Sequence, residues 1–144
     1  MLVCNSCWQT KNKCKCKVVE KFIEIDDNIY LAIKKLNLLG YKTVYCCGGH
    51  TDERGIQAYI VFDWKQNQQV FDSLPDGWQY DSYSYRKIKY YKYNILRSAI
   101  TLKKKQIDKL TEEQKQEMID NNIKHLIQWI ERLKERGLSN GGKR

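Results

Sequence analysis

Four of the six cysteines in this 144-residue chain lie within thirteen residues, in the stretch CNSCWQTKNKCKC. A Cys-x-x-Cys turn directs two sulfurs toward a common centre, and a second close pair completes the tetrahedron that Zn²⁺ prefers. Cys4 and Cys7 form the first pair, and Cys14 and Cys16 form the second with one residue between them. The spacing therefore predicts a zinc knuckle over residues 1–17.

Disulfides and redox chemistry are the alternatives to metal binding at these four cysteines. The chain begins with no apolar segment that would direct secretion, and no later apolar run is long enough to span a bilayer. We therefore expect a soluble, cytoplasmic protein, in which clustered cysteines are more often metal ligands than disulfides. Because four thiolates leave no coordination position for a substrate, the expected role of the zinc is structural.

The net charge of +9 is unevenly distributed along the chain. Residues 1–17 carry four lysines and no acid, and residues 78–110 carry nine basic and two acidic residues. Residues 18–77 have a net charge of −3. Two basic blocks around a mildly acidic body favour nucleic acid or a nucleoprotein as partner, although the N-terminal lysines also balance the negative charge of a four-thiolate zinc site.

The middle of the chain predicts an α+β domain over residues 18–110. Asp26 and Asp27 are good helix N-caps, and an apolar stripe follows them as far as Gly40. Strands are predicted at residues 18–25, 41–47, 56–63 and 78–95, the last as one long strand or a hairpin, and a short second helix at residues 64–74. This order favours a ferredoxin-like (split βαβ) fold, with helices on one face of an antiparallel sheet.

The sequence of the C-terminal segment, residues 111–137, predicts one long amphipathic helix over residues 111–136. The sequence TEEQ at Thr111 is a capping-box pattern, and Gly137 lies just past the expected end. Apolar residues recur at heptad-like spacing, namely Ile119, Ile123, Leu126, Ile130 and Leu133. This face can pack on its own domain or on a second copy of the helix. We expect residues 138–144 to be disordered.

A second cysteine element, GYKTVYCCGGH, places Cys46 and Cys47 at a strand end shortly before His50. Alternation along a strand sends the two sulfurs to opposite faces, so at most one of them easily meets His50. Three interpretations stay open: a cysteine nucleophile with His50 as base and Asp52 or Glu53 as orienting group; a second metal site whose third and fourth ligands are not evident; or buried cysteines beside a glycine turn.

A stretch rich in tyrosine and basic residues, from Tyr83 to Arg97, overlaps the predicted strand or hairpin, and more lysines follow it. On a strand, alternate tyrosines and lysines would share one face, on which nucleic-acid bases can stack while ammonium groups meet phosphates. Tyrosine and arginine also anchor protein interfaces, and a solvated sheet face is the third interpretation. The candidate binding residues are Tyr83, Tyr85, Arg86, Lys87, Lys89, Tyr91, Lys92, Tyr93, Arg97, Lys103, Lys104 and Lys105.

The Cys4–Cys16 knuckle together with the segment from Gly40 to Phe62 resembles small proteins carried by phages and mobile elements of AT-rich bacteria. That resemblance implies a metal-containing inhibitor of host defence, such as an anti-CRISPR protein that binds a Cas nuclease and blocks its access to DNA. We therefore expect a non-enzymatic, zinc-stabilised binding protein. Direct binding of nucleic acid through the tyrosine and lysine surface is the main alternative, and a Cys/His-dependent enzyme is a minor one. The sequence leaves the oligomeric state open.

Overall fold

A computed structural model describes residues 1–52, 55–63, 71–84, 92–99 and 101–133 of the chain, and for residues 81–84 and 92–95 it describes the backbone. The elements, in chain order, are strands β1 (Leu2–Cys4) and β2 (Phe22–Glu24), helix α1 (Tyr30–Leu38), strands β3 (Thr43–Cys47), β4 (Tyr59–Asp63), β5 (Trp78–Ser84) and β6 (Lys92–Ser98), and helices α2 (Lys104–Asp108) and α3 (Glu112–Glu131). The protein is therefore of the α+β class.

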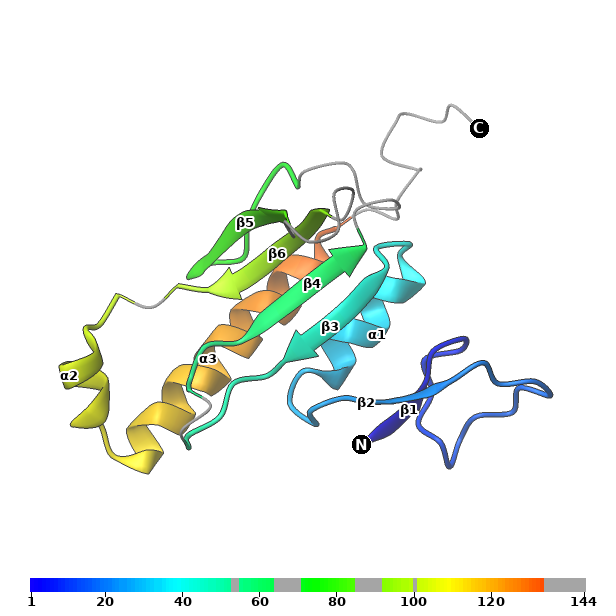
Figure 1. Cartoon of the computed structure of the whole chain (residues 1–144), viewed down its shortest axis with the longest axis horizontal. Coiled ribbons are helices and arrows are strands. Elements are labelled where there is room, and N and C mark those ends of the chain that lie inside the picture. The colour runs from blue at the N-terminus through cyan, green and yellow to red at the C-terminus, as the bar shows by residue number, and fades with distance from the viewer. Residues whose placement is uncertain (53–54, 64–70, 85–91, 100, 134–144) are drawn as a thin grey trace.

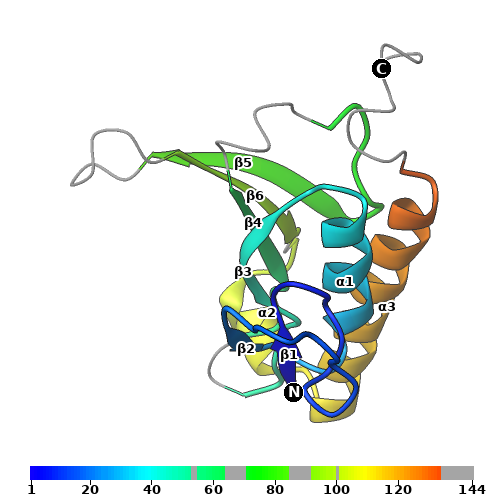
Figure 2. The ribbon, with the colours of Figure 1, turned by 90° about the vertical axis from the view of Figure 1, so that its right-hand side faces the viewer.

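Two antiparallel sheets organise the described residues. β1 and β2 form a small two-stranded sheet, and the second sheet has the order β3-β4-β6-β5. Helices α1 and α3 lie together against one face of the larger sheet, as the two views in Figures 1 and 2 show. None of the described helices combines the length and the apolar character that crossing a bilayer requires.

Alternation along the strands separates a buried face of the sheet from an outer one. On β4, Ile60 and Phe62 are fully buried, whereas Val61 between them belongs to the other face. Leu96 and Ser98 on β6 are buried in the same way. We call the side turned away from α1 and α3 the outer face. By register it carries Tyr45, Cys47, Tyr59, Val61, Asp63, Gln79 and Arg97.

Helix α3 covers the sheet as the apolar periodicity predicted. Thr111 is its N-cap and forms the predicted capping box with Gln114, and the predicted positions Ile119, Ile123, Leu126 and Ile130 are buried. The seam thus packs on its own domain. The helix ends at Glu131 rather than at residue 136, because the last turn closes through a bond from the Leu133 N–H to the Ile130 carbonyl.

An aromatic cluster fixes the end of α3 against the sheet. The ring of Phe71 lies 5.0 Å from that of Trp129, 5.1 Å from that of Tyr41 and 5.3 Å from that of Phe62, measured between centroids. The indole N–H of Trp129 donates to the hydroxyl of Ser73 at 2.8 Å. The buried ring therefore keeps its polar atom paired while it joins helix, sheet and loop.

Helix α1 starts later than the sequence predicted, and its start corrects the N-cap assignment. The N-cap is Ile29, and no side chain caps the helix there. The carboxylate of Asp26 instead accepts a hydrogen bond from the backbone N–H of Gly48 at 2.9 Å, so it is engaged by a distant loop. The predicted C-terminal stop at Gly40 is confirmed, since this residue has a left-handed φ of 94°.

The predicted strand at residues 18–25 is shortened to β2, and β2 pairs with β1 rather than with the larger sheet. For that reason the ferredoxin-like order is not confirmed, although the α+β class is. Residues 78–95 were predicted to form one long strand or a hairpin, and the antiparallel pairing of β5 with β6 agrees with the hairpin. The helix predicted at residues 64–74 falls mainly outside the described residues, and its described part, residues 71–74, is not helical.

Truncation of Phe62 tests the assignment of the two faces. We expect Phe62→Ala to lower the free energy of unfolding by about 3–5 kcal/mol, because a fully buried ring leaves a cavity. Tyr45→Ala is the matched control, since this ring lies on the neighbouring strand and is 65% exposed, and its cost should stay within about 1 kcal/mol. Denaturant unfolding followed by circular dichroism measures both, and similar losses in the two variants would contradict the assignment.

Candidate metal centre

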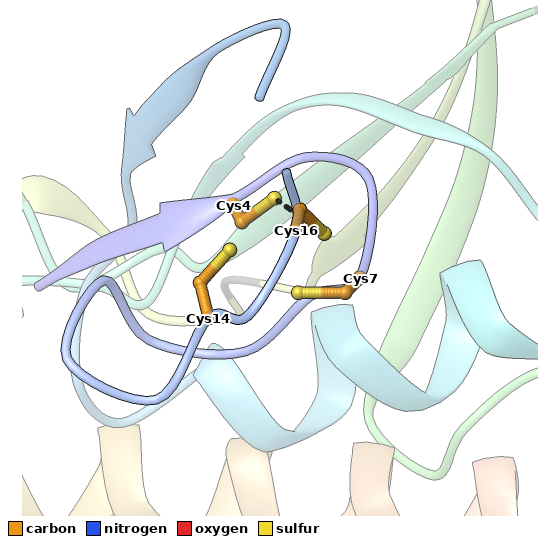
Figure 3. A group of neighbouring side chains, drawn as sticks. All are labelled: Cys4, Cys7, Cys14 and Cys16. Atoms are coloured by element: carbon orange, nitrogen blue, oxygen red, sulfur yellow. Dashed lines mark hydrogen bonds between the residues drawn. The ribbon is translucent and has the colours of Figure 1, made fainter. Parts of the chain in front are cut away.

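The four N-terminal cysteines converge on one small space (Figure 3). Their Sγ atoms all lie within 4.8 Å of one another, and those of Cys4 and Cys16 are 4.0 Å apart. Two sulfurs bound to one zinc at about 2.3 Å in tetrahedral geometry would lie about 3.8 Å apart. Cys4 is buried and the other three are half-buried. The cluster therefore has the size and enclosure to hold a metal ion.

Backbone hydrogen bonds shape the loop that carries these sulfurs. Cys4 is the last residue of β1. Its N–H donates a hydrogen bond to the Gln9 carbonyl at 2.9 Å, and its carbonyl accepts one from the Trp8 N–H at 2.9 Å. Trp8 has a positive φ of 62°, which turns the chain back toward β1. The N–H of Ser6 points at the Cys4 sulfur from 3.4 Å, a contact that stabilises a thiolate. The N–H of Cys14 is likewise fixed, by the Thr10 carbonyl at 2.9 Å.

The cysteine loop is attached to the rest of the protein through its apolar residues. Val3 is fully buried, and Trp8 is 8% exposed within the main core. The hydroxyl of Tyr30, in the first turn of α1, donates to the Trp8 carbonyl at 2.8 Å. The terminal ammonium of Met1 donates to the Ile25 carbonyl at 2.7 Å. The position of the loop is therefore tied to the segment that leads into α1.

The thiols of the cluster affect one another strongly. Backbone N–H groups of Cys7 and Ser6 lower the pKa of Cys4 to about 6, whereas the neighbouring thiols of Cys7 and Cys14 raise the pKa of Cys16 to about 12. Several negative charges cannot share this space without a cation. A bound metal would displace the remaining thiol protons, so its affinity should rise with pH.

The second cysteine element separates its two sulfurs, because Cys46 packs against the hydrophobic core and Cys47 lies on the outer face. Burial raises the pKa of the Cys46 thiol to about 12, with Asp26 and Cys47 adding to the effect. Cys47 does come close to His50. The carboxylate beside them belongs to Asp26, a residue that the sequence analysis assigned to helix capping. Of the other two candidates, Asp52 is exposed and Glu53 is outside the described residues.

The tyrosine and lysine surface is only partly described. Lys103, Lys104 and Lys105 are exposed at the start of α2, and Arg97 is half-buried on the outer face of β6. The backbone of β5 and β6 carries Tyr83 opposite Tyr93, with Lys92 opposite Ser84. Five predicted residues fall outside the described part of the chain, namely Tyr85, Arg86, Lys87, Lys89 and Tyr91.

Comparisons with known proteins give no match to this chain, whether with protein-family models, with curated proteins or with solved structures.

Loss of metal from the four-cysteine cluster should loosen residues 4–21 first. This segment has few backbone bonds and little core of its own, so treatment with a chelator, or the substitution Cys7→Ser, should increase its amide hydrogen exchange. The four-stranded sheet should keep its protection. Hydrogen exchange measured by mass spectrometry resolves the two regions. Asn12→Ser, an exposed change in the same loop, is the control and should alter neither. Equal loss of protection throughout the chain would contradict a local role.

Proposed function

We propose that the protein is a non-enzymatic binding protein, stabilised by zinc at Cys4, Cys7, Cys14 and Cys16, that engages a nucleoprotein effector. The observation that carries this proposal is the outer face of the sheet, which exposes large side chains on strands held rigidly by the core. The proposal has three parts: the identity of the metal, the surface used and the kind of partner.

Zinc is the metal that suits four cysteine ligands best. Thiolates are soft ligands and select zinc or iron–sulfur clusters, and a single closed tetrahedron of four thiolates is typical of structural zinc. The sulfur separations are those of one ion. A closed shell offers no position for a substrate, so the cluster supports a role in stability rather than in catalysis.

The outer face has the residue types of a protein-binding surface. Tyr45 is 65% exposed and Tyr59 is 37% exposed, and the register places Tyr59 between Cys47 on β3 and Arg97 on β6. Tyrosine and arginine are enriched among the residues that dominate binding energy at interfaces. Turning the Gln79 amide brings its oxygen within 2.7 Å of the Arg97 Nε, which holds the guanidinium on this face. The surface is thus preorganised, which lowers the entropic cost of binding.

Charge favours an acidic partner. The chain has a net charge of +9, and the exposed lysines at 103–105 contribute to it. A positive field accelerates association with polyanions and with proteins that carry them. An inhibitor of a Cas nuclease is the narrower form of the proposal, and its support is the resemblance of residues 4–16 and 40–62 to small phage proteins. Direct binding of nucleic acid is the second candidate, supported by the same charge and by tyrosines on which bases can stack.

Metal analysis tests the zinc assignment. Protein purified without added metal should contain zinc, and Cys4→Ser with Cys7→Ser should remove the zinc held by this cluster, because two thiolates cannot complete the shell. Val18→Ala is the control, since this residue lies in the same region and is 85% exposed. Iron in place of zinc, or a zinc content that does not fall after the double substitution, would contradict the assignment.

Photo-cross-linking tests the outer face and separates the two candidates. A photoreactive residue at position 45 should cross-link to a partner in cells that encode the protein, whereas one at position 18 should not. If the partner is a nucleoprotein, capture through its protein component should survive nuclease treatment. Direct binding of nucleic acid predicts instead that capture is lost with nuclease, and that the affinity of the purified chain for an oligonucleotide falls steeply with added salt. Equal cross-linking from both positions would exclude the outer face as the binding surface.

A further inference from the structure

Two loops meet beside the end of β3 and bring together three residues that are distant in sequence. Asp26 comes from the connection between β2 and α1, Cys47 is the last residue of β3, and His50 follows two glycines later. One ligand atom from each of the three lies within 4.8 Å of the other two. Nε2 of His50 is 3.3 Å from Oδ2 of Asp26. All three residues are half-buried.

Backbone groups hold the Asp26 and Cys47 ligand atoms in place. The N–H of Gly48 donates to Oδ2 of Asp26 at 2.9 Å, and the N–H of Gly49 points at the Cys47 sulfur from 3.4 Å. The backbone N–H of His50 donates to the Gly55 carbonyl at 2.9 Å, which closes the turn that carries the imidazole. These three backbone contacts thus fix the loop that brings the ligand atoms together.

The two glycines between Cys47 and His50 are explained by this close approach. A Cβ atom on Gly48 would lie 1.8 Å from the side-chain oxygen of Asn28, whose amide group donates to the Gly48 carbonyl at 2.9 Å. Gly49 has a φ of +88°, and a Cβ there would lie 2.7 Å from the Ile56 carbonyl oxygen. Gly48 thus passes close to Asn28, just before α1, and Gly49 passes close to the backbone of Ile56.

The one separation between a nitrogen and an oxygen in this cluster matches that of two donors that share one small metal ion. A nitrogen and an oxygen bound to zinc at about 2.0 Å with tetrahedral angles lie about 3.3 Å apart, and a nitrogen and a sulfur lie about 3.6 Å apart. The observed separation of 3.3 Å between the Asp26 oxygen and the His50 nitrogen equals the first of these values. The donor set of carboxylate, thiolate and imidazole suits zinc, and a three-residue set is typical of sites whose fourth position is open.

A catalytic relay does not fit the same geometry. In a thiol–imidazole–carboxylate relay the sulfur and the carboxylate bond opposite nitrogens of the ring, which separates them by about 7 Å. Here a carboxylate oxygen of Asp26 and the sulfur of Cys47 lie within 4.8 Å of each other. An ion pair between Asp26 and His50 would explain the contact between these two side chains. It would not explain why the Cys47 sulfur also lies within 4.8 Å of both.

We propose that Asp26, Cys47 and His50 form a second zinc site, with three protein ligands and a fourth position open to water or to a donor atom from a partner. Cys47 lies opposite Tyr59 in the sheet, so the open position borders the outer face. This site is independent of the four-cysteine cluster in its ligands, and its three ligands leave free a coordination position that a fourth cysteine fills in that cluster.

Metal stoichiometry tests the second site. The purified full-length chain, reduced and supplied with Zn²⁺, should bind two equivalents that resist a buffer exchange. Asp26→Asn, Cys47→Ser and His50→Gln should each bind one, because removal of one of three ligands destroys the site. Retention of the first equivalent, with an unchanged circular dichroism spectrum, shows that each variant is folded. Cys7→Ser should lose the other equivalent and keep this one.

Two neighbouring residues supply matched controls. Asp27→Asn changes the adjacent acid, whose side chain is 83% exposed, and Cys46→Ala removes the adjacent thiol, which packs against the core. Both should keep two equivalents. Substitution of Co²⁺ adds a second readout, since the sulfur-to-cobalt absorption should lose one thiolate's contribution in Cys47→Ser. One equivalent in the parent chain, or two in all three ligand variants, overturns the proposal. Neither outcome would contradict the assignment of zinc to the four-cysteine cluster.

Discussion

The convergence of four cysteine sulfurs within 4.8 Å of one another is the constraint on which the N-terminal third of the chain depends, because as thiolates they would repel one another. Around them the protein supplies two three-residue strands and a few loop hydrogen bonds, which is too little to hold the sulfurs together. A bound cation reverses the sign of that interaction. Because Trp8 and Val3 of the same loop are buried in the main core, a bound metal would also fix how the chain enters α1.

The parts of the fold that could be predicted from the sequence are those determined by residues close together in the chain. The capping box at Thr111 and the stripe from Ile119 to Ile130 depend on residues within one helix, and the four clustered cysteines lie within thirteen residues. The hairpin of β5 and β6 follows from local alternation. The pairing of β2 with β1 could not be predicted, because it joins residues 18 to 22 positions apart in the sequence, beside the contact between the Met1 ammonium and Glu24 at 2.8 Å.

Asp26 shows why the second cluster escaped the sequence analysis. An aspartate just before a helix is ordinarily explained by capping, and the local pattern contained nothing else to explain. Its actual partners, the Gly48 N–H and the imidazole of His50, are more than twenty residues away. The one local signal was the pair of glycines after Cys47, since a loop that needs two of them usually passes close to another segment of backbone. The glycine pair indicates that this loop passes close to another segment, but it does not identify Asp26 as the residue that lies there.

The two proposed metal sites would have opposite effects on charge. Four thiolates and one Zn²⁺ replace four neutral thiols, which lowers the formal net charge by two. At the second site one thiolate and one Zn²⁺ replace one neutral thiol, which raises it by one, beside the half-buried Arg97 and the exposed Tyr59. If zinc occupies both sites, the closed site removes positive charge from the N-terminal block, whereas the open site adds it on the outer face. Metal binding would thus concentrate the attraction for the proposed acidic partner on the surface that carries the exposed tyrosines.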